Sequence, residues 1–196
     1  MLAVLLAATA SAQFQPPDEA HDLPDFSMTA VTAKSIRPLG KKNLLGRVWV
    51  ADFFFTTCKG VCPMVTGRFM ELQKRLPKEV LAVSFTIDPD NDKPGVLQTY
   101  AVAHAADPER WLFLTTSSQA AMIPLLRDGF ATAYRKDSTA ACGYRTEHST
   151  KFVLVDATGR VVHMYASENP AEMDRLVREA AALIPARAIK RKKTAP

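Results

Sequence analysis

The chain has 196 residues, of which 47% are hydrophobic and 23% are charged. This composition excludes disordered, fibrous and disulfide-dense proteins, and the length allows one domain with a sizeable core. The formal net charge is +5, and five cationic residues near the C-terminus equal all of it: Arg187, Lys190, Arg191, Lys192 and Lys193. The remainder is therefore close to neutral and has no basic, aromatic-interleaved face, so we do not expect a nucleic-acid reader. We interpret the basic tail, residues 185–196, as a solvated end, with contact to anionic lipid head groups as the alternative.

The N-terminal residues 1–12 resemble a signal peptide. They form a short apolar run that ends in Ala10-Ser11-Ala12, the small-x-small pattern of a cleavage site, although the usual positive n-region is missing. The run is too short to span a bilayer as a helix. We therefore expect export, with a mature protein that is periplasmic or tethered to the membrane at its N-terminus and faces the periplasm. A non-native N-terminal fragment is the alternative. Residues 13–25 contain three prolines and predict a linker.

Alternating and continuous apolar runs predict the strands in the next part of the chain. These strands lie at residues 26–34, 47–55, 80–87, 111–115, 130–134, 150–155 and 161–165, and the last two flank a hairpin signal at Ala157-Thr158-Gly159. Apolar residues at helical spacing predict helices at 63–76 and 93–105, a third after Ser117 or Ser118, and a last one capped by Asn169 with Glu172 completing a capping box. Residues 136–147 read as an irregular loop.

The order of these elements predicts the fold class. Three strand–helix units imply parallel pairing with helices covering the sheet. A closing hairpin and a final helix complete the thioredoxin-like arrangement. We expect a single α/β domain over residues 26–184, with a central mixed sheet flanked by helices.

Cys58 and Cys62 lie on the turn between the aromatic strand and the helix behind Pro63. Helix N-termini present unpaired N–H groups and the positive end of the macrodipole, which favours thiolate over thiol. Lys59 would favour the thiolate further. Because a thiolate is both a nucleophile and a soft metal ligand, the pair predicts electron transfer, metal binding or both. A static disulfide is the simpler alternative, although we expect this turn to be exposed.

Several segments together resemble the Sco/SenC family over roughly residues 23–184. They are Thr56-Thr57-Cys58-Lys59-Gly60-Val61-Cys62-Pro63, Thr86-Ile87-Asp88-Pro89 with Asp92 and Pro94, Glu147-His148-Ser149-Thr150, Leu154-Val155-Asp156 and Gly159-Arg160. The resemblance implies a thioredoxin-like fold and a copper ion bound by Cys58, Cys62 and His148. It also implies a metallochaperone that delivers copper to the dinuclear copper site of cytochrome c oxidase or prepares the thiols of that site. The implied partner is the copper-site subunit of the oxidase or another copper chaperone.

The residue chemistry agrees with this resemblance, with two departures. Soft thiolates select Cu(I), and imidazole also suits Cu(II). A three-ligand site keeps an open position for transfer, and it needs a reduced pair, so oxidation would switch it off. Family members often carry proline after the first cysteine and an acid before the second, whereas Lys59 and Val61 stand there.

The same pair also fits a thiol–disulfide oxidoreductase that reduces partner cysteines through Cys58 and Cys62. This alternative does not need His148, and the sequence leaves open whether the protein is an enzyme. A peroxiredoxin-like peroxidase is disfavoured because its single peroxidatic cysteine has a different environment.

Cys142 lies in the irregular loop, and its role stays open among an inert residue, a resolving thiol and an extra soft ligand. With the three proposed ligands it would form a closed, structural Cys₃His zinc site, a minor alternative. We interpret His21, His104 and His163 as structural or solvated residues.

The acids Asp88, Asp90 and Asp92 have the spacing of a calcium loop. Lys93 stands where glycine is needed and Thr99 where the bidentate glutamate would be, so calcium is rejected. We expect this segment to form a turn and cap the next helix, with Asp88 near the thiols in the fold.

Overall fold

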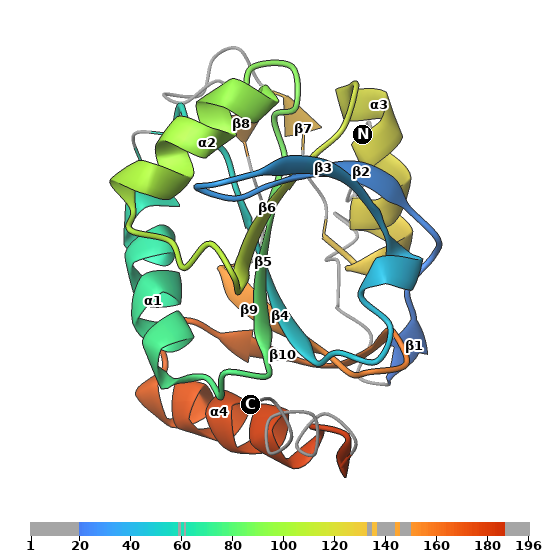
Figure 1. Ribbon diagram of the computed structural model, residues 1–196, viewed down its shortest axis with the longest axis vertical. Coiled ribbons are helices and arrows are strands. Elements are labelled where there is room, and N and C mark those ends of the chain that lie inside the picture. Colours follow the sequence, from blue (N-terminus) through green and yellow to red (C-terminus); the bar gives the residue numbers. More distant parts are fainter. Residues whose placement is uncertain are drawn as a thin grey trace, which may run out of the picture.

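The computed structural model describes residues 20–58, 60, 62–132, 135–136, 144–145 and 150–186. Its centre is an eight-stranded mixed sheet with the order β1-β10-β9-β4-β5-β6-β2-β3 (Figure 1). The strands are β1 (His21–Asp22), β2 (Ser27–Val31), β3 (Ile36–Gly40), β4 (Trp49–Phe54), β5 (Leu81–Thr86), β6 (Trp111–Thr115), β9 (Lys151–Val155) and β10 (Arg160–Ala166). A separate antiparallel pair consists of β7 (Arg135–Lys136) and β8 (Tyr144–Arg145). In the part of the chain that the structure describes, no helix has the length and apolar character needed to cross a membrane.

The three central strands β4, β5 and β6 run parallel, with Phe53 opposite Phe85 and Phe85 opposite Leu114. Every residue of these strands is buried. Helices cover both faces of a parallel sheet, so its strands are apolar on both sides, and this explains their nearly continuous hydrophobic runs. The β9–β10 hairpin and the β2–β3 hairpin extend the sheet in antiparallel fashion on either side.

The helices fall into two groups. Figure 1 shows α1 (Cys62–Arg75) and α2 (Pro94–Ala103) on one side of the central strands and α3 (Gln119–Pro124) on the other. α4 (Pro170–Ala182) packs on β10 and α1. The short 3-10 helix η1 (Lys41–Asn43) follows β3, and a π-helical turn, η2 (Leu125–Gly129), continues α3.

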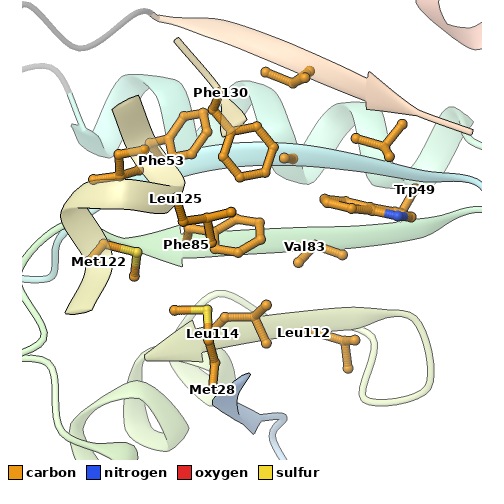
Figure 2. Close-up of a cluster of buried hydrophobic side chains, with 14 of the residues drawn as sticks. Met28, Trp49, Phe53, Val83, Phe85, Leu112, Leu114, Met122, Leu125 and Phe130 are labelled. Carbon is orange, nitrogen blue, oxygen red and sulfur yellow. The ribbon is translucent and has the colours of Figure 1, made fainter. Parts of the chain in front are cut away.

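The two faces of the sheet have separate apolar cores. Apolar side chains from α1, α2 and α4 fill the face that includes Val50 and Phe113. On the other face, α3 and η2 contribute Met122 and Leu125 to a cluster with aromatic rings from β4 and β5 (Figure 2). The Phe85 ring lies at the centre of this second cluster, 5.1 Å from the ring of Phe130 between centroids.

The sheet must be strongly curled, because β1 and β2 are far apart in its order but close in the chain. Five strands lie between them in the sheet, and only residues 23–26 join them. Six strand spacings would separate them by about 29 Å in a flat sheet. The connection can reach at most about 18 Å when fully extended. Residues 23–26 therefore form a strap from the edge strand β1 to β2, the neighbour of the other edge strand β3, and the strap is held by a hydrogen bond from Lys41 Nζ to the carbonyl of Leu23.

Most predicted elements are confirmed, including the single α/β domain with a mixed sheet and the hairpin around Gly159, whose φ is 85°. Asn169 caps α4 as expected, since its side chain accepts from the N–H groups of Ala171 and Glu172. The capping-box role of Glu172 is wrong, because its carboxylate accepts from the N–H of Ala166 instead.

Four segments differ from the prediction. The irregular loop expected at 136–147 contributes Lys136 to β7 and contains β8, Tyr144–Arg145. The described part of the expected linker, residues 20–25, contains β1, and Leu23 is only 2% exposed because it packs into the core. Strand β3 was not predicted, because only Leu39 of its five residues is buried. The strand expected at 130–134 is wrong for residues 130–132, where Phe130 follows the π-helical turn, while residues 133–134 lie outside the described residues.

Candidate functional site

The two motif cysteines lie where the central strand β4 gives way to helix α1. Cys62 is the first residue of α1, and the N–H of Cys58 donates to the carbonyl of Phe55 at 3.3 Å. This turn therefore sits at the carboxyl end of a parallel strand, the edge of an α/β sheet where ligands usually bind. The predicted strand-to-helix placement of the pair is confirmed.

Both cysteines are buried, which corrects the expectation of an exposed turn. Cys58 is 7% exposed and Cys62 is 2% exposed, and both belong to the apolar cluster beneath α3 and η2. The reason is packing between distant segments, because the turn, Phe55 and side chains of α3 and η2 belong to one apolar cluster. A reagent or partner therefore has more access to Cys58 than to Cys62, and full access to the pair needs a local opening.

Asp92 forms a polar network beside this turn. Its carboxylate accepts from the backbone N–H of Thr56 at 3.2 Å and from the hydroxyls of Thr56 and Thr86. Its carbonyl oxygen accepts from the hydroxyl of Thr115 at 2.9 Å. Burial raises the pKa of Asp92, the hydrogen bonds from Thr56 and Thr86 act in the opposite direction, and the charge of Asp88 adds to the rise.

The segment from Asp88 to Asp92 forms the expected turn, with the N–H of Asp92 bonded to the carbonyl of Asp88 at 2.8 Å. One carboxylate oxygen of Asp88 accepts from the side chain of Asn91, whereas Oδ1 is buried with no hydrogen-bond partner among the described residues. The helix-capping role is wrong, because the N-cap of α2 is Lys93 and no side chain bonds there. The turn is tied to Thr56, two residues before Cys58, through Asp92.

A second buried acid, Asp52, was missed by the sequence interpretation. It lies in β4 opposite Ser84, and burial raises its pKa to about 7 while a hydrogen bond from Ser84 opposes the rise. An acid in the middle of an otherwise apolar strand was the signal that could have revealed it, because such residues are rarely buried without a partner.

The pKa of Tyr100 shows that Asp52 and Asp92 lie near the cysteine turn. Its hydroxyl shares a hydrogen bond of 3.0 Å with that of Thr66 in α1. Its pKa is raised to about 12, mainly by burial, and negative charge on Asp52, Cys62 and Asp92 contributes to the rise. These three acidic groups therefore lie within electrostatic range of one buried hydroxyl.

His148, the third predicted copper ligand, lies outside the described residues, as do Cys142, Lys59 and Val61. Over the ranges that the structure describes, no three His, Cys, Asp or Glu side chains form a group suited to a metal ion. The three-ligand set of Cys58, Cys62 and His148 therefore stays a prediction.

The other histidines make contacts within the fold. The Nε2 of His21 lies 2.8 Å from the carbonyl oxygen of Gly129, and the Nδ1 of His104 lies 2.9 Å from that of Tyr100. The ring of His163 packs edge-on against Tyr165.

The fold and the cysteine turn together define a thioredoxin-like protein with a dithiol at the carboxyl end of its central parallel strand. The SCO1/SenC family model matches residues 16–184, and the chain belongs to this family. The chain is 35% identical over 127 residues to a SCO1 protein homolog of Bacillus subtilis, a match that covers 63% of this chain and 64% of that protein. It thus spans slightly less than two thirds of that relative. A SCO2-like protein of Rickettsia conorii is 30% identical over 142 residues, covering 69% of this chain and 67% of its own length.

Solved structures share the fold. A SCO1/SenC family lipoprotein from Bacillus anthracis has a TM-score of 0.72 and 32% identity, covering 89% of this chain and 100% of that one. BsSco, described as a Sco family cytochrome c oxidase assembly protein with a disulfide switch, has a TM-score of 0.73 and 28% identity, covering 88% and 99%. ScoI of Bradyrhizobium japonicum, solved with copper bound, has a TM-score of 0.67 and 19% identity, covers 83% and 99%, and shares the fold alone.

Proposed function

We propose that this protein is a copper metallochaperone that binds the ion through Cys58, Cys62 and His148. It passes copper to, or prepares the thiols of, the dinuclear copper site of cytochrome c oxidase. The observation that carries the proposal is the position of both cysteines at one strand-to-helix turn in a chain of the SCO1/SenC family. Its partner is the copper-site subunit of the oxidase or another copper chaperone, and it works in the periplasm or on the membrane surface that faces the periplasm.

The chemistry of the two sulfur atoms supports copper as the cargo. Thiolates are soft ligands that select Cu(I), and the imidazole of His148 would also suit Cu(II). Cys62 starts α1, where unpaired N–H groups and the helix dipole favour the thiolate form. Two sulfurs and one nitrogen leave the coordination sphere open, which a transfer protein needs because the receiving thiols must reach the ion.

The family relatives support the cargo and the location. ScoI carries copper in its structure, and BsSco is described as assembling cytochrome c oxidase. The Bacillus anthracis relative is a lipoprotein, which supports an exported protein held at a membrane by its N-terminus. The signal-like residues 1–12 and the proline-containing residues 13–19 fit such an arrangement.

A second candidate is a thiol–disulfide oxidoreductase that uses the same pair. It is favoured by the difference in burial, since Cys58, at 7% exposed, is the less deeply buried thiol and Cys62, at 2%, the deeper one, which suits attack by one thiol and resolution by the other. The disulfide switch described for BsSco also supports redox chemistry at this turn.

The test is the copper content of reduced protein in wild-type and substituted forms. We expect wild type and Cys142→Ser to bind equimolar Cu(I), and the Cys58→Ala/Cys62→Ala variant to bind none. If the double variant bound Cu(I) as well as wild type, the copper proposal would be overturned.

His148→Ala separates the two candidates. A metallochaperone loses copper affinity by about tenfold or more in this variant, while its exchange with a small disulfide is retained. If His148→Ala left copper affinity unchanged, the histidine would not be a ligand.

A further inference from the structure

Asp92 ties together the carboxyl ends of three parallel strands. Its carboxylate bonds to Thr56, just after β4, and to Thr86, the last residue of β5. Its carbonyl bonds to Thr115, the last residue of β6. One residue in a turn thus fixes the edge of the sheet at which the cysteine turn begins.

The link from Asp92 to the cysteine turn is short. Thr56 is bonded to Asp92 through both its N–H and its hydroxyl, and Cys58 follows two residues later. Phe55, directly before Thr56, provides the carbonyl to which the Cys58 N–H donates. The backbone that leads to Cys58 is therefore held by Asp92 through Thr56.

Burying a carboxylate in a turn lowers the stability of the fold, because the charged group loses its hydration. Asp92 is 0% exposed, and desolvation raises its pKa even though Thr56 and Thr86 donate to it. Natural proteins retain destabilising buried charges of this kind chiefly at functional sites, where a fixed geometry outweighs the loss of stability. Stability alone does not account for this carboxylate.

We propose that Asp92 is a positioning residue that fixes the Cys58 sulfur for its chemistry through the backbone at Thr56. The proposal rests on the proposed function of the cysteine pair, because it assigns Asp92 a role in that same site. It concerns geometry, and it holds whether the pair carries copper or exchanges disulfides.

The experiment compares the alkylation rates of Cys58 and Cys62 within the same molecule, by peptide mass spectrometry on reduced protein. Global unfolding exposes both thiols equally, so it moves the ratio of the two rates towards that of the unfolded chain, whereas a loosened turn raises the rate of Cys58 selectively. We expect Asp92→Asn to raise the Cys58-to-Cys62 ratio by about tenfold and to weaken Cu(I) binding by about 10- to 100-fold.

Thr56→Val removes the donor of the hydrogen bond between the Thr56 hydroxyl and the Asp92 carboxylate. This variant provides the test if Asp92→Asn fails to fold. It removes the hydroxyl but keeps the backbone N–H, so we expect a smaller change in the same direction. In the double variant the effect should be no larger than in Asp92→Asn alone, because both changes remove one interaction.

Asp107→Asn is the matched control. Asp107 also closes a turn with its carboxylate, accepting from the N–H of Glu109 at 3.0 Å, but it precedes β6 and lies at the opposite end of that strand. We expect its Cys58-to-Cys62 ratio to equal that of wild type.

Unchanged ratios in both Asp92→Asn and Thr56→Val would overturn the positioning role. If wild type bound no Cu(I), the proposed function would fail, and the alkylation ratio would still decide the role of Asp92.

Discussion

The strands β4 and β5 contribute to two regions with opposite character. Near their middle, Phe53 and Phe85 pack into an aromatic cluster, with their ring centroids 6.0 Å apart. At their carboxyl ends, within a few residues, the same two strands are followed by the Thr56–Asp92 network and the buried acid Asp88. The first region stabilises the fold by removing apolar surface from water. The second keeps carboxylates out of water, which opposes folding, and holds the cysteine turn in place.

In β4 and β5, therefore, the residues that stabilise the fold lie only a few positions before those that shape the site. A change in the aromatic region should alter the free energy of unfolding with little effect on the geometry of the site. A change in the polar region should alter the geometry of the site with less effect on the free energy of unfolding, or should alter that free energy mainly as a function of pH.

The largest effect is expected for Phe85→Ala. The side chain is 0% exposed and contacts several aromatic rings, so its removal should lower the free energy of unfolding by about 3–5 kcal/mol. Urea unfolding followed by circular dichroism measures this loss. The control is Val102→Ala, whose side chain is 62% exposed and which should change little. An equal loss in both variants would contradict the assignment of stability to the aromatic cluster.

Asp52→Asn should change the pH dependence of stability. Because the folded-state pKa of Asp52 is raised from 3.8 to about 7, its contribution is complete below pH 4 and is lost as the pH rises through about 7. Asparagine does not titrate. Relative to wild type, the variant should therefore gain stability between pH 4 and pH 7, by at most roughly 4 kcal/mol. Urea unfolding of both proteins at several pH values gives this difference.

Asp107→Asn provides a control of opposite sign for this measurement. A hydrogen bond from Arg110 lowers the pKa of Asp107, so its stabilising contribution is present above the pKa of the unfolded chain and is lost as the pH falls. The variant should therefore lose stability relative to wild type as the pH rises through about 4. Parallel curves for the two variants would disprove the assignment of a raised pKa to Asp52.

Asn169→Ala tests a polar group that supports stability alone. The side chain accepts from two N–H groups in the first turn of α4, and its loss should cost about 1 kcal/mol. Thermal unfolding measures the change, while Cu(I) affinity should equal that of wild type. Asn169→Asp keeps a capping oxygen and should restore most of the stability. A loss of copper affinity in Asn169→Ala would show that a change in stability far from the cysteine turn also alters the site.

The smallest effect is expected for the ion pair of Arg75 and Asp174 between α1 and α4. The nitrogen and oxygen are 2.5 Å apart, but the two side chains are 44% and 57% exposed. Exposed pairs contribute about 0–1 kcal/mol, and salt screens them. A double-mutant cycle with Arg75→Ala and Asp174→Ala should give a coupling energy in this range that falls in high salt.

The sequence predicted the parts of the fold that depend on hydrophobic pattern. The apolar spacing of Val65, Phe69 and Leu72 correctly indicated α1, and the Gly159 turn correctly indicated the β9–β10 hairpin. It missed β3, because only one of the five residues of this edge strand is buried, so its sequence shows no alternation of apolar and polar residues. It misread Phe130 as part of a strand, because a single buried aromatic at the end of a π-helical turn gives no period.

For the site, the sequence located the cysteine turn but not its surroundings. The motif spacing placed Cys58 and Cys62 between β4 and α1, and the structure confirms this position. Their burial depends on side chains from α3 and η2, more than fifty residues away, which local patterns do not encode. The contacts of Asp92 were missed for the same reason, since Thr56, which donates to its carboxylate, lies 36 positions away. Asp52 was overlooked although an acid within an apolar strand is a local signal.

The strap of residues 23–26 has a mechanical consequence for a chain that is held by its N-terminal side. Tension applied there acts first on β1, whose described residues pair with β10 at two positions, His21 with Val161 and Asp22 with Arg160. Next along the chain, the N–H of Leu23 donates to the carbonyl of Gly159 and Lys41 Nζ donates to the carbonyl of Leu23, so these bonds bear the load after β1. Strand β4 and the cysteine turn lie several strands inward in the sheet. With the proposed N-terminal tether, tension would therefore reach these outer contacts before the turn that bears Cys58.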